Sequence, residues 1–332
     1  MAVTEAVPPL LDVRGLTKRF EVVRQEGVRR IPETIRAVDG INLRLTKGET
    51  LGLVGESGCG KSTAGRTILR LIEPSSGVVL FEGSDLARLS DREMRSMRRH
   101  LGIVFQDPMS ALNPRMRVRD ILAEPLQVHG IVRTRREAQE RACALLHLVG
   151  LRADMAERYP HEFSGGQRQR IGVARAIATE PRLIILDEPI SALDVSVRAQ
   201  ILNLLADLQE QLQPAYLLIA HDLSVVRHAC DRVAVMYLGI IVEEGPSDAL
   251  FAETLHPYTR ALLAAAPSVD PGRPVRRTPI EGDVPTAVSI PTGCRFRTRC
   301  PIARPICAEE EPELREWRPG RTAACHFAGD PS

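Results

Sequence analysis

The residues best suited to chemistry lie in one glycine-rich segment, GESGCGKST, at positions 55–63. A short apolar run at 51–54 precedes it, and a helical pattern begins near Lys61. Strand, glycine-rich turn and helix in this order match a phosphate-binding loop. Its backbone N–H groups can surround phosphate oxygens, and the helix N-terminus adds a favourable dipole. A glycine-rich turn that binds nothing is the weaker interpretation, because the motif is intact in the context it requires.

Two side chains of this loop have separate expected tasks. We expect the Lys61 ammonium to reach the β- and γ-phosphates of a nucleotide and the Ser62 hydroxyl to bind Mg²⁺. The thiol chemistry of the loop cysteine is not required for this role. The other loop residues expected to surround the nucleotide are Gly55, Glu56, Ser57, Gly58, Cys59, Gly60 and Thr63.

Two adjacent carboxylates form the second candidate group. The segment RLIILDEP predicts a buried strand that delivers Asp187 and Glu188 to the edge of a sheet. Neighbouring side chains of a strand point to opposite sides, so the two acids can have different tasks. Asp187 would hold Mg²⁺ through its coordination shell, and Glu188 would orient or deprotonate an attacking water. A solvated strand end is the common alternative, but the phosphate-binding loop favours the functional interpretation.

The elements that must position these residues form an α/β pattern. The segments RLIILDE, AYLLIAH and RVAVMYLG predict buried strands separated by helical stretches. Near the N-terminus, LLDVRGLTKRF and INLRLTKGE alternate as half-exposed strands do, and the polar stretch 21–36 between them predicts a loop. Residues 113–165 are rich in helix formers with apolar residues at helical spacing, which predicts an inserted helical subdomain.

Length and charge limit the remaining possibilities. A chain of 332 residues exceeds one usual compact domain, and we expect a main domain at 1–266 and a small, irregular extension at 267–332. Prolines are concentrated in this extension, which disfavours continuous helices and central strands there. The formal net charge of +2 creates no field that favours nucleic acid. No apolar run is long enough to cross a bilayer, and the N-terminus lacks a secretory signal, so we expect a cytoplasmic location.

Further motifs identify a family. FSGGQRQR at 163–170 resembles the signature of ABC ATPases, and SALD at 191–194 resembles their D-loop. Gln106 in FQDP stands where the family's Q-loop glutamine is expected, and His221 in LLIAHDL resembles the switch histidine. A lone histidine is more often structural, so its assignment depends on the other motifs. The resemblance covers about residues 10–266, with every core motif present and in order.

The resemblance implies the α/β fold of a P-loop NTPase of the ABC type, with an antiparallel β-subdomain and an inserted helical subdomain. It implies an ATPase that uses ATP and Mg²⁺, with Gln106 as a magnesium ligand that also senses the γ-phosphate. Two ATPase subunits would pack head to tail, so that the signature of one meets the γ-phosphate on Lys61 of the other. The signature and D-loop residues carried over in this way are Ser164, Gly165, Gly166, Gln167 and Asp194.

Three positions are compared with the residues that are common in the family. Phe20 matches the aromatic position that stacks on adenine, although an ordinary core phenylalanine is an equal alternative. Phe163 replaces the Leu that usually precedes SGGQ, and Ile190 replaces the Thr common after DEP. Because neither change removes a catalytic group, we expect an active site with Glu188 and His221 in their usual roles.

The C-terminal part of the chain indicates which subfamily of ABC ATPases the sequence resembles. HPYTRALLAAAP at 256–267, followed by a proline-rich tail with four cysteines, resembles the extension of peptide-importer ATPases. The resemblance implies two transmembrane permease subunits, an extracytoplasmic substrate-binding protein, and attachment at the cytoplasmic face of the cell membrane. The transported substrate stays open among dipeptides, longer peptides, nickel complexes and other small solutes.

The tail cysteines Cys294, Cys300, Cys307 and Cys325 are separated by five, six and seventeen residues, which departs from the CxxC spacing of zinc ribbons. Members of the family with such a tail carry an iron–sulfur cluster, and four thiolates suffice for a [4Fe–4S] unit. A ligand would also explain how a short proline-rich segment stays folded. Zinc and four unligated thiols remain the alternatives.

Two other classes of ABC ATPase fit less well. DNA-repair types place a long coiled coil between the phosphate loop and the signature, and translation types carry two ATPase units, whereas this chain has a short insertion and one unit. An inactive regulatory subunit is disfavoured because Glu188 and His221 are intact. The sequence therefore predicts a transport ATPase.

Overall fold

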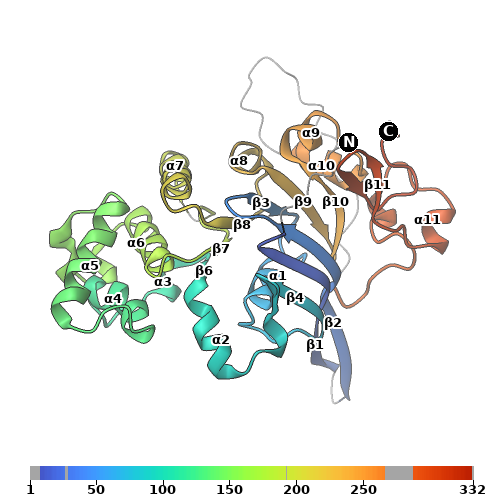
Figure 1. Ribbon diagram of the computed structural model, residues 1–332. Helices are drawn as coiled ribbons and strands as arrows, with labels where there is room; N and C mark the ends of the chain where they lie inside the picture. The colour runs from blue at the N-terminus through green and yellow to red at the C-terminus, as the bar shows by residue number, and fades with distance from the viewer. Residues whose placement is uncertain (1–7, 27–28, 192, 266–286, 331–332) are drawn as a thin grey trace. The chain divides into compact units, whose positions relative to one another are not determined.

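The computed structural model describes residues 8–26, 29–191, 193–265 and 287–330. Within these limits the chain divides into two compact units (Figure 1). The first unit holds residues 8–10, 46–49 and 88–218, and the second holds 11–45, 50–87 and 219–330. The predicted boundary between residues 266 and 267 lies outside the described residues and stays a prediction.

An antiparallel sheet opens the second unit. Its strand order is β2-β1-β4-β5. Leu11 of the first strand pairs with Leu45 of the second and with Phe81 of β4, and all three side chains are buried. This sheet is the predicted antiparallel layer. The strands are β1 (Leu11–Glu26), β2 (Arg29–Leu45), β4 (Ser76–Phe81) and β5 (Ser84–Asp85).

The predicted loop at 21–36 is wrong, because residues 21–26 belong to β1 and residues 29–36 to β2, and these strands pair antiparallel (blue in Figure 1). The Thr34 hydroxyl donates to the Glu21 carboxylate across the hairpin at 3.0 Å. Arg24 and Glu33 form a second cross-strand pair at 3.4 Å. Polar pairs of this kind stabilise strands without a buried face, so the apolar alternation that marks a half-buried strand is absent here.

A second sheet in this unit carries the phosphate loop. β3 (Thr50–Val54) pairs in parallel with β9 (Arg232–Tyr237), and β9 pairs antiparallel with β10 (Ile240–Pro246). Every residue of β3 is buried, as expected for a strand covered on both faces. The helices of this unit are α1 (Lys61–Ile68), α8 (Leu223–Ala229), α9 (Ser247–Ala252), α10 (Pro257–Ala265) and α11 (Ile306–Glu309).

The cysteine tail joins this sheet, which its proline content did not predict. β12 (Arg321–Ala323) pairs with β10, and β11 (Arg315–Arg318) pairs with β12. Pro319 lies in the turn between the two short strands, so it interrupts neither of them. Outside these strands the described tail consists of short helical turns and irregular segments.

The first unit is largely helical around two parallel strands, β6 (Leu101–Val104) and β7 (Leu183–Asp187). The region 113–165 contains helices and no strand, as predicted. Its α5 begins with a capping box, in which the Thr134 hydroxyl accepts from the Glu137 amide. The helices are α2 (Asp91–Met97), α3 (Pro108–Ala111), α4 (Val118–Val128), α5 (Arg135–Leu148), α6 (Gly165–Ile177) and α7 (Val195–Leu212).

β8 (Ala215–Ala220) is buried throughout and carries the chain from the first unit into the second. None of the helices in the described residues is long and apolar enough to cross a membrane.

Candidate functional site

The phosphate loop connects β3 to α1, and two of its glycines are required by close backbone contacts. Gly60, just before α1, has φ 112°, and a Cβ there would lie 2.0 Å from the Ala37 carbonyl oxygen. A Cβ on Gly55 would lie 2.2 Å from the Met236 carbonyl oxygen. Both distances are far below van der Waals contact, so only glycine fits. The loop is thus pressed against two neighbouring segments of the second unit.

Lys61 is held inside this loop. Its Nζ atom donates to the Gly55 carbonyl at 2.8 Å and to the Glu56 carbonyl at 2.9 Å, and the residue is only 3% exposed. Both acceptors are uncharged carbonyl oxygens of the loop itself. The backbone of the loop therefore fixes the position of this side chain.

The other loop residues line this turn at different depths. Ser57 and Gly58 are exposed at its tip, whereas Ser62 and Thr63 are half-buried in the first turn of α1. Cys59 is buried, and burial raises the pKa of its thiol, which favours the neutral form. This agrees with the expectation that its thiol chemistry is not used.

The two acidic residues lie in the first unit and have different surroundings. Asp187 ends β7 and is 1% exposed. Glu188 follows outside the strand with φ 48°, and its carboxylate accepts a hydrogen bond from the Gln106 side-chain amide at 3.0 Å. The two acids were expected to point to opposite sides because neighbouring side chains of a strand alternate. Instead, they differ because Asp187 lies in the strand and Glu188 lies in the turn after it. The predicted base and the predicted Q-loop glutamine are brought together.

The signature segment forms the start of α6. Ser164 is its exposed N-cap and makes a capping box with Gln167, with N–O distances of 3.0 and 3.3 Å. A Cβ on Gly166 would lie 2.5 Å from Cγ1 of Val197, so the glycine permits close approach of α7. Asp194 is exposed at the N-cap of α7. The serine and aspartate are thus both placed at helix N-termini of the first unit.

Two further predicted residues lie in the second unit. His221 follows β8 and is exposed. Phe20 lies on β1 opposite Ile35, is half-buried, and has the Lys18 ammonium 4.9 Å from its ring centre. A half-exposed aromatic ring can stack on a flat ligand, and Phe20 is not part of the buried core.

Sequence comparison is decisive for the family. Residues 38–191 match the model of the family described as ABC transporter, and residues 242–307 match that described as oligopeptide/dipeptide transporter, C-terminal region. A putative peptide import ATP-binding protein of Brucella ovis is 51% identical over 317 residues, which cover 96% of this chain and 97% of that protein. The chain belongs to the ABC transporter ATP-binding proteins.

Other relatives agree with this family assignment. The oligopeptide transport ATP-binding protein AppF of Bacillus subtilis is 50% identical, over 96% of this chain and 97% of its own. Among solved structures, the ABC cassette MJ0796, a dimer bound to ADP and Pi, superposes with a TM-score of 0.62 and 29% identity, over 71% of this chain and 98% of that one. The structure of cbiO1 from Clostridium perfringens, part of the ABC transporter complex cbiONQ, also gives a TM-score of 0.62, with 28% identity, over 74% of this chain and 91% of that one. The predicted fold class is confirmed.

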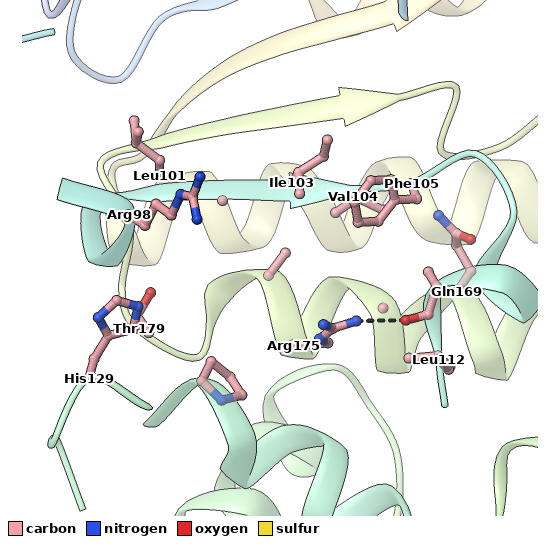
Figure 2. A pocket seen from close by; sticks show the side chains of 15 residues that line it. Arg98, Leu101, Ile103, Val104, Phe105, Leu112, His129, Gln169, Arg175 and Thr179 are labelled. Carbon is pink, nitrogen blue, oxygen red and sulfur yellow. Dashed lines mark hydrogen bonds between the residues drawn. The ribbon is translucent and has the colours of Figure 1, made fainter. Parts of the chain in front are cut away.

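A cavity in the first unit of this ABC ATPase lies between β6, α3, α4 and α6 (Figure 2). Its volume is about 680 Å³, including the part open to solvent. Arg175 lines it and donates to the Ala111 carbonyl at 2.6 Å. Gln169 also lines it, is 1% exposed, and its side-chain nitrogen has no hydrogen-bond partner within the described part of the chain. Burial lowers the pKa of His129, at the edge of the cavity, which favours the uncharged imidazole.

The four tail cysteines, which the sequence leaves far apart, line a single small cavity in the second unit. His256, Phe296 and Phe327 complete much of its wall. Burial raises the pKa of Cys294 and Cys325 to about 11 and also raises that of Cys300, so these thiols are protonated at neutral pH. Within the described ranges, no three His, Cys, Asp or Glu side chains are grouped closely enough to hold a metal ion.

Two residues that contact the phosphate loop were not predicted from the sequence. The Tyr258 hydroxyl accepts a hydrogen bond from the Glu56 amide at 2.8 Å, and Arg299 forms an ion pair with the Glu56 carboxylate. Tyr258 belongs to the HPY segment that suggested the subfamily, but nothing in its spacing pointed to the loop. Their contacts depend on how the C-terminal region folds back on the second unit.

Proposed function

We propose that this chain is the ATP-hydrolysing subunit of an ABC importer that takes up dipeptides or longer peptides. The observation that carries the proposal is the match of its C-terminal region to that of oligopeptide and dipeptide transporters, on a chain with an intact nucleotide loop. Relatives named for peptide import cover almost the whole chain. ATP binding and closure of an ATPase dimer would drive the transport cycle.

The nucleotide roles follow the chemistry of each group. Lys61 contacts the β- and γ-phosphates, and Ser62, Gln106 and Asp187 hold Mg²⁺ or its water ligands. The Glu188 carboxylate takes a proton from the attacking water, and His221 stabilises the γ-phosphate as the bond breaks. Phe20 stacks on the adenine ring.

The active unit is a dimer. Ser164, Gly166 and their neighbours at the start of α6 contact the γ-phosphate bound by the other subunit, because an exposed helix N-terminus attracts anions. The second subunit is either an identical copy of this chain or a similar ABC ATPase. The cassette MJ0796, whose fold is similar, was solved as a dimer.

The membrane partners are two permease subunits, served outside the membrane by a substrate-binding protein, and this chain works at the cytoplasmic face. We place the permease contact at the cavity of the first unit. Phe105 lines this cavity and directly precedes Gln106, which bonds to Glu188. The side-chain amide nitrogen of Gln169, which has no hydrogen-bond partner among the described residues, can donate to a carbonyl of the permease.

The test of this function compares hydrolysis by the isolated chain with hydrolysis in membranes that also contain permease subunits of a peptide importer from the same organism. We expect turnover to rise when the permeases are present and to rise further with a peptide-loaded binding protein. Unchanged turnover in the assembled complex would argue against a transport role, and stimulation by nickel complexes but not by peptides would reject the peptide class.

We further propose that the tail cysteines hold a metal centre, as a [4Fe–4S] cluster or as zinc. Four thiols around one cavity match the donor set of either group. Because a metal binds cysteine as the thiolate and burial raises the pKa of the Cys294, Cys300 and Cys325 thiols, binding would release protons from these three residues. Binding would also move the cysteines closer together. Cys294, Cys300, Cys307 and Cys325 would act as ligands, and the group would stabilise the fold of the tail.

Replacing Cys300 with Ser is expected to remove the metal. Protein purified without oxygen should contain iron and sulfide with visible absorption if the cluster is present, and the variant should lose most of both. The Cys143→Ser variant is the control, because Cys143 lies on α5 in the first unit and does not line the cysteine cavity. Zinc in place of iron would overturn the cluster, and metal-free wild-type protein from anaerobic cells would overturn both centres.

A further inference from the structure

An ion pair joins the cysteine tail to the phosphate loop. Nη1 and Nη2 of Arg299 donate to the two carboxylate oxygens of Glu56 at 2.7 and 2.8 Å, the two-pronged geometry in which these groups bind most strongly. The Arg299 side chain is 4% exposed and that of Glu56 is 24% exposed. Arg299 ends a helical turn directly before Cys300. A buried tail residue therefore reaches the loop that binds phosphates.

A second contact reaches the same loop residue. The hydroxyl of Tyr258, which is fully buried, accepts from the Glu56 amide. Its ring packs against those of Tyr237 and Phe296, at centroid distances of 4.6 and 5.4 Å. With the Lys61 ammonium on its carbonyl, Glu56 is bound at its amide, its carbonyl and its carboxylate. This one residue therefore connects the tail to the catalytic lysine.

The charge of Glu56 makes the ion pair relevant to nucleotide binding. A carboxylate in a loop that receives a triphosphate repels the ligand unless a cation neutralises it. The Arg299 guanidinium supplies that positive charge from a buried position, where salt screens it less than at the surface. Glu56 thereby anchors the loop to the tail without lowering the affinity of the loop for anions.

We propose that Arg299 is a positioning residue for ATP binding, which acts through Glu56 by neutralising its charge and fixing the phosphate loop. The nucleotide affinity of this ATPase then depends on the folded state of its cysteine tail. The proposal rests on the nucleotide-binding role proposed above for the loop.

The alternative is that Arg299 only anchors the tail, and the chain offers a matched control. Arg295 is a neighbouring buried arginine that ties the tail to the same unit, with bonds of 2.7 Å to the Asp39 carboxylate and 2.7 Å to the Leu238 carbonyl. Within the described residues, the hydrogen bonds of its side chain go to Asp39, Leu238 and Glu311, and none of these lies in the loop at 55–63. Arg295→Gln therefore weakens tail anchoring and leaves the charge of the loop unchanged.

The experiment measures the affinity of the full-length chain for labelled ATP with Mg²⁺, and the KM and kcat of hydrolysis. The variants are Arg299→Gln, Arg299→Lys, Glu56→Gln, the Arg299→Gln/Glu56→Gln double variant, and Arg295→Gln. We expect Arg299→Gln to weaken ATP binding about tenfold, the effect of one uncompensated charge near a bound anion. The change should appear in KM more than in kcat and should shrink as salt is raised.

Charge neutralisation gives a distinctive pattern in the other variants. Glu56→Gln in the Arg299→Gln background should restore most of the affinity, because it removes the unpaired carboxylate, and Arg299→Lys should retain part of it. Thermal unfolding of each variant shows whether a loss of ATP binding comes from a loss of folding. If Arg299→Gln does not fold, the ATP affinity of Glu56→Gln is measured in its place, because the Glu56 side chain is partly exposed.

Each result decides between the alternatives. Equal losses in Arg295→Gln and Arg299→Gln, or strictly additive effects in the double variant, would overturn the proposal and leave Arg299 as an anchor. If wild-type protein bound no nucleotide, the proposed function would fail first, before any variant was compared.

Discussion

Replacing Glu188 with Gln is expected to reduce ATP turnover by about 10²- to 10⁴-fold, the usual contribution of a general base, while ATP still binds. Gln106 donates to this carboxylate, and the amide oxygen of glutamine can accept the same bond. The substitution thus changes the basicity of the group more than its position. ATP held without hydrolysis should also favour the closed dimer.

Single-turnover hydrolysis and equilibrium binding of labelled ATP check this result, with dimerisation followed by light scattering. Glu210→Gln is the matched control, since it removes one carboxylate from an exposed position on α7. It should hydrolyse ATP like wild type. Unchanged hydrolysis by the Glu188 variant would exclude this residue as the base.

Replacing Gly60 with Ala should abolish nucleotide binding and lower the free energy of unfolding by about 2–4 kcal/mol, as expected for a backbone clash in a strained conformation. The added methyl would lie 2.0 Å from the Ala37 carbonyl oxygen. Either the loop or the neighbouring segment of β2 must move. Since Lys61 directly follows Gly60, any movement of the loop displaces the ammonium from its carbonyl partners.

Gly58→Ala provides the comparison within the same loop. Gly58 also has positive φ, 80°, but no atom lies within 4 Å of a Cβ built there. Its replacement should cost only backbone strain, roughly 1 kcal/mol, and should leave most of the ATP affinity. Thermal unfolding and labelled-ATP binding distinguish the two variants. Similar losses in both would mean that strain, and not the contact with Ala37, controls the loop.

Motifs and apolar runs correctly predicted those helices and strands whose positions depend on residues near one another in the sequence. The helix at Lys61 and the strand ending at Asp187 lie where the motif and the apolar run place them. The hairpin through residues 21–36 was missed, because its polar strands are stabilised by each other and bury no apolar face that would leave a periodic pattern.

The same limit applies to the candidate site. The phosphate loop and the acidic pair follow from residue types at fixed spacing, but the hydrogen bond from Gln106 to Glu188 joins residues that lie far apart in the chain. The conformation of Glu188 outside the strand was also not predicted, because alternation describes only residues within a strand.

Short motifs in the amino-acid sequence identify the family of this protein and the chemistry of its nucleotide loop, because the spacing of these motifs is set along the chain. The cavity lined by four distant cysteines and the ion pair between Arg299 and Glu56 follow only from the folded structure. The energy of such contacts comes from groups far apart in the sequence. Their distance and shared burial exist only after the chain has folded.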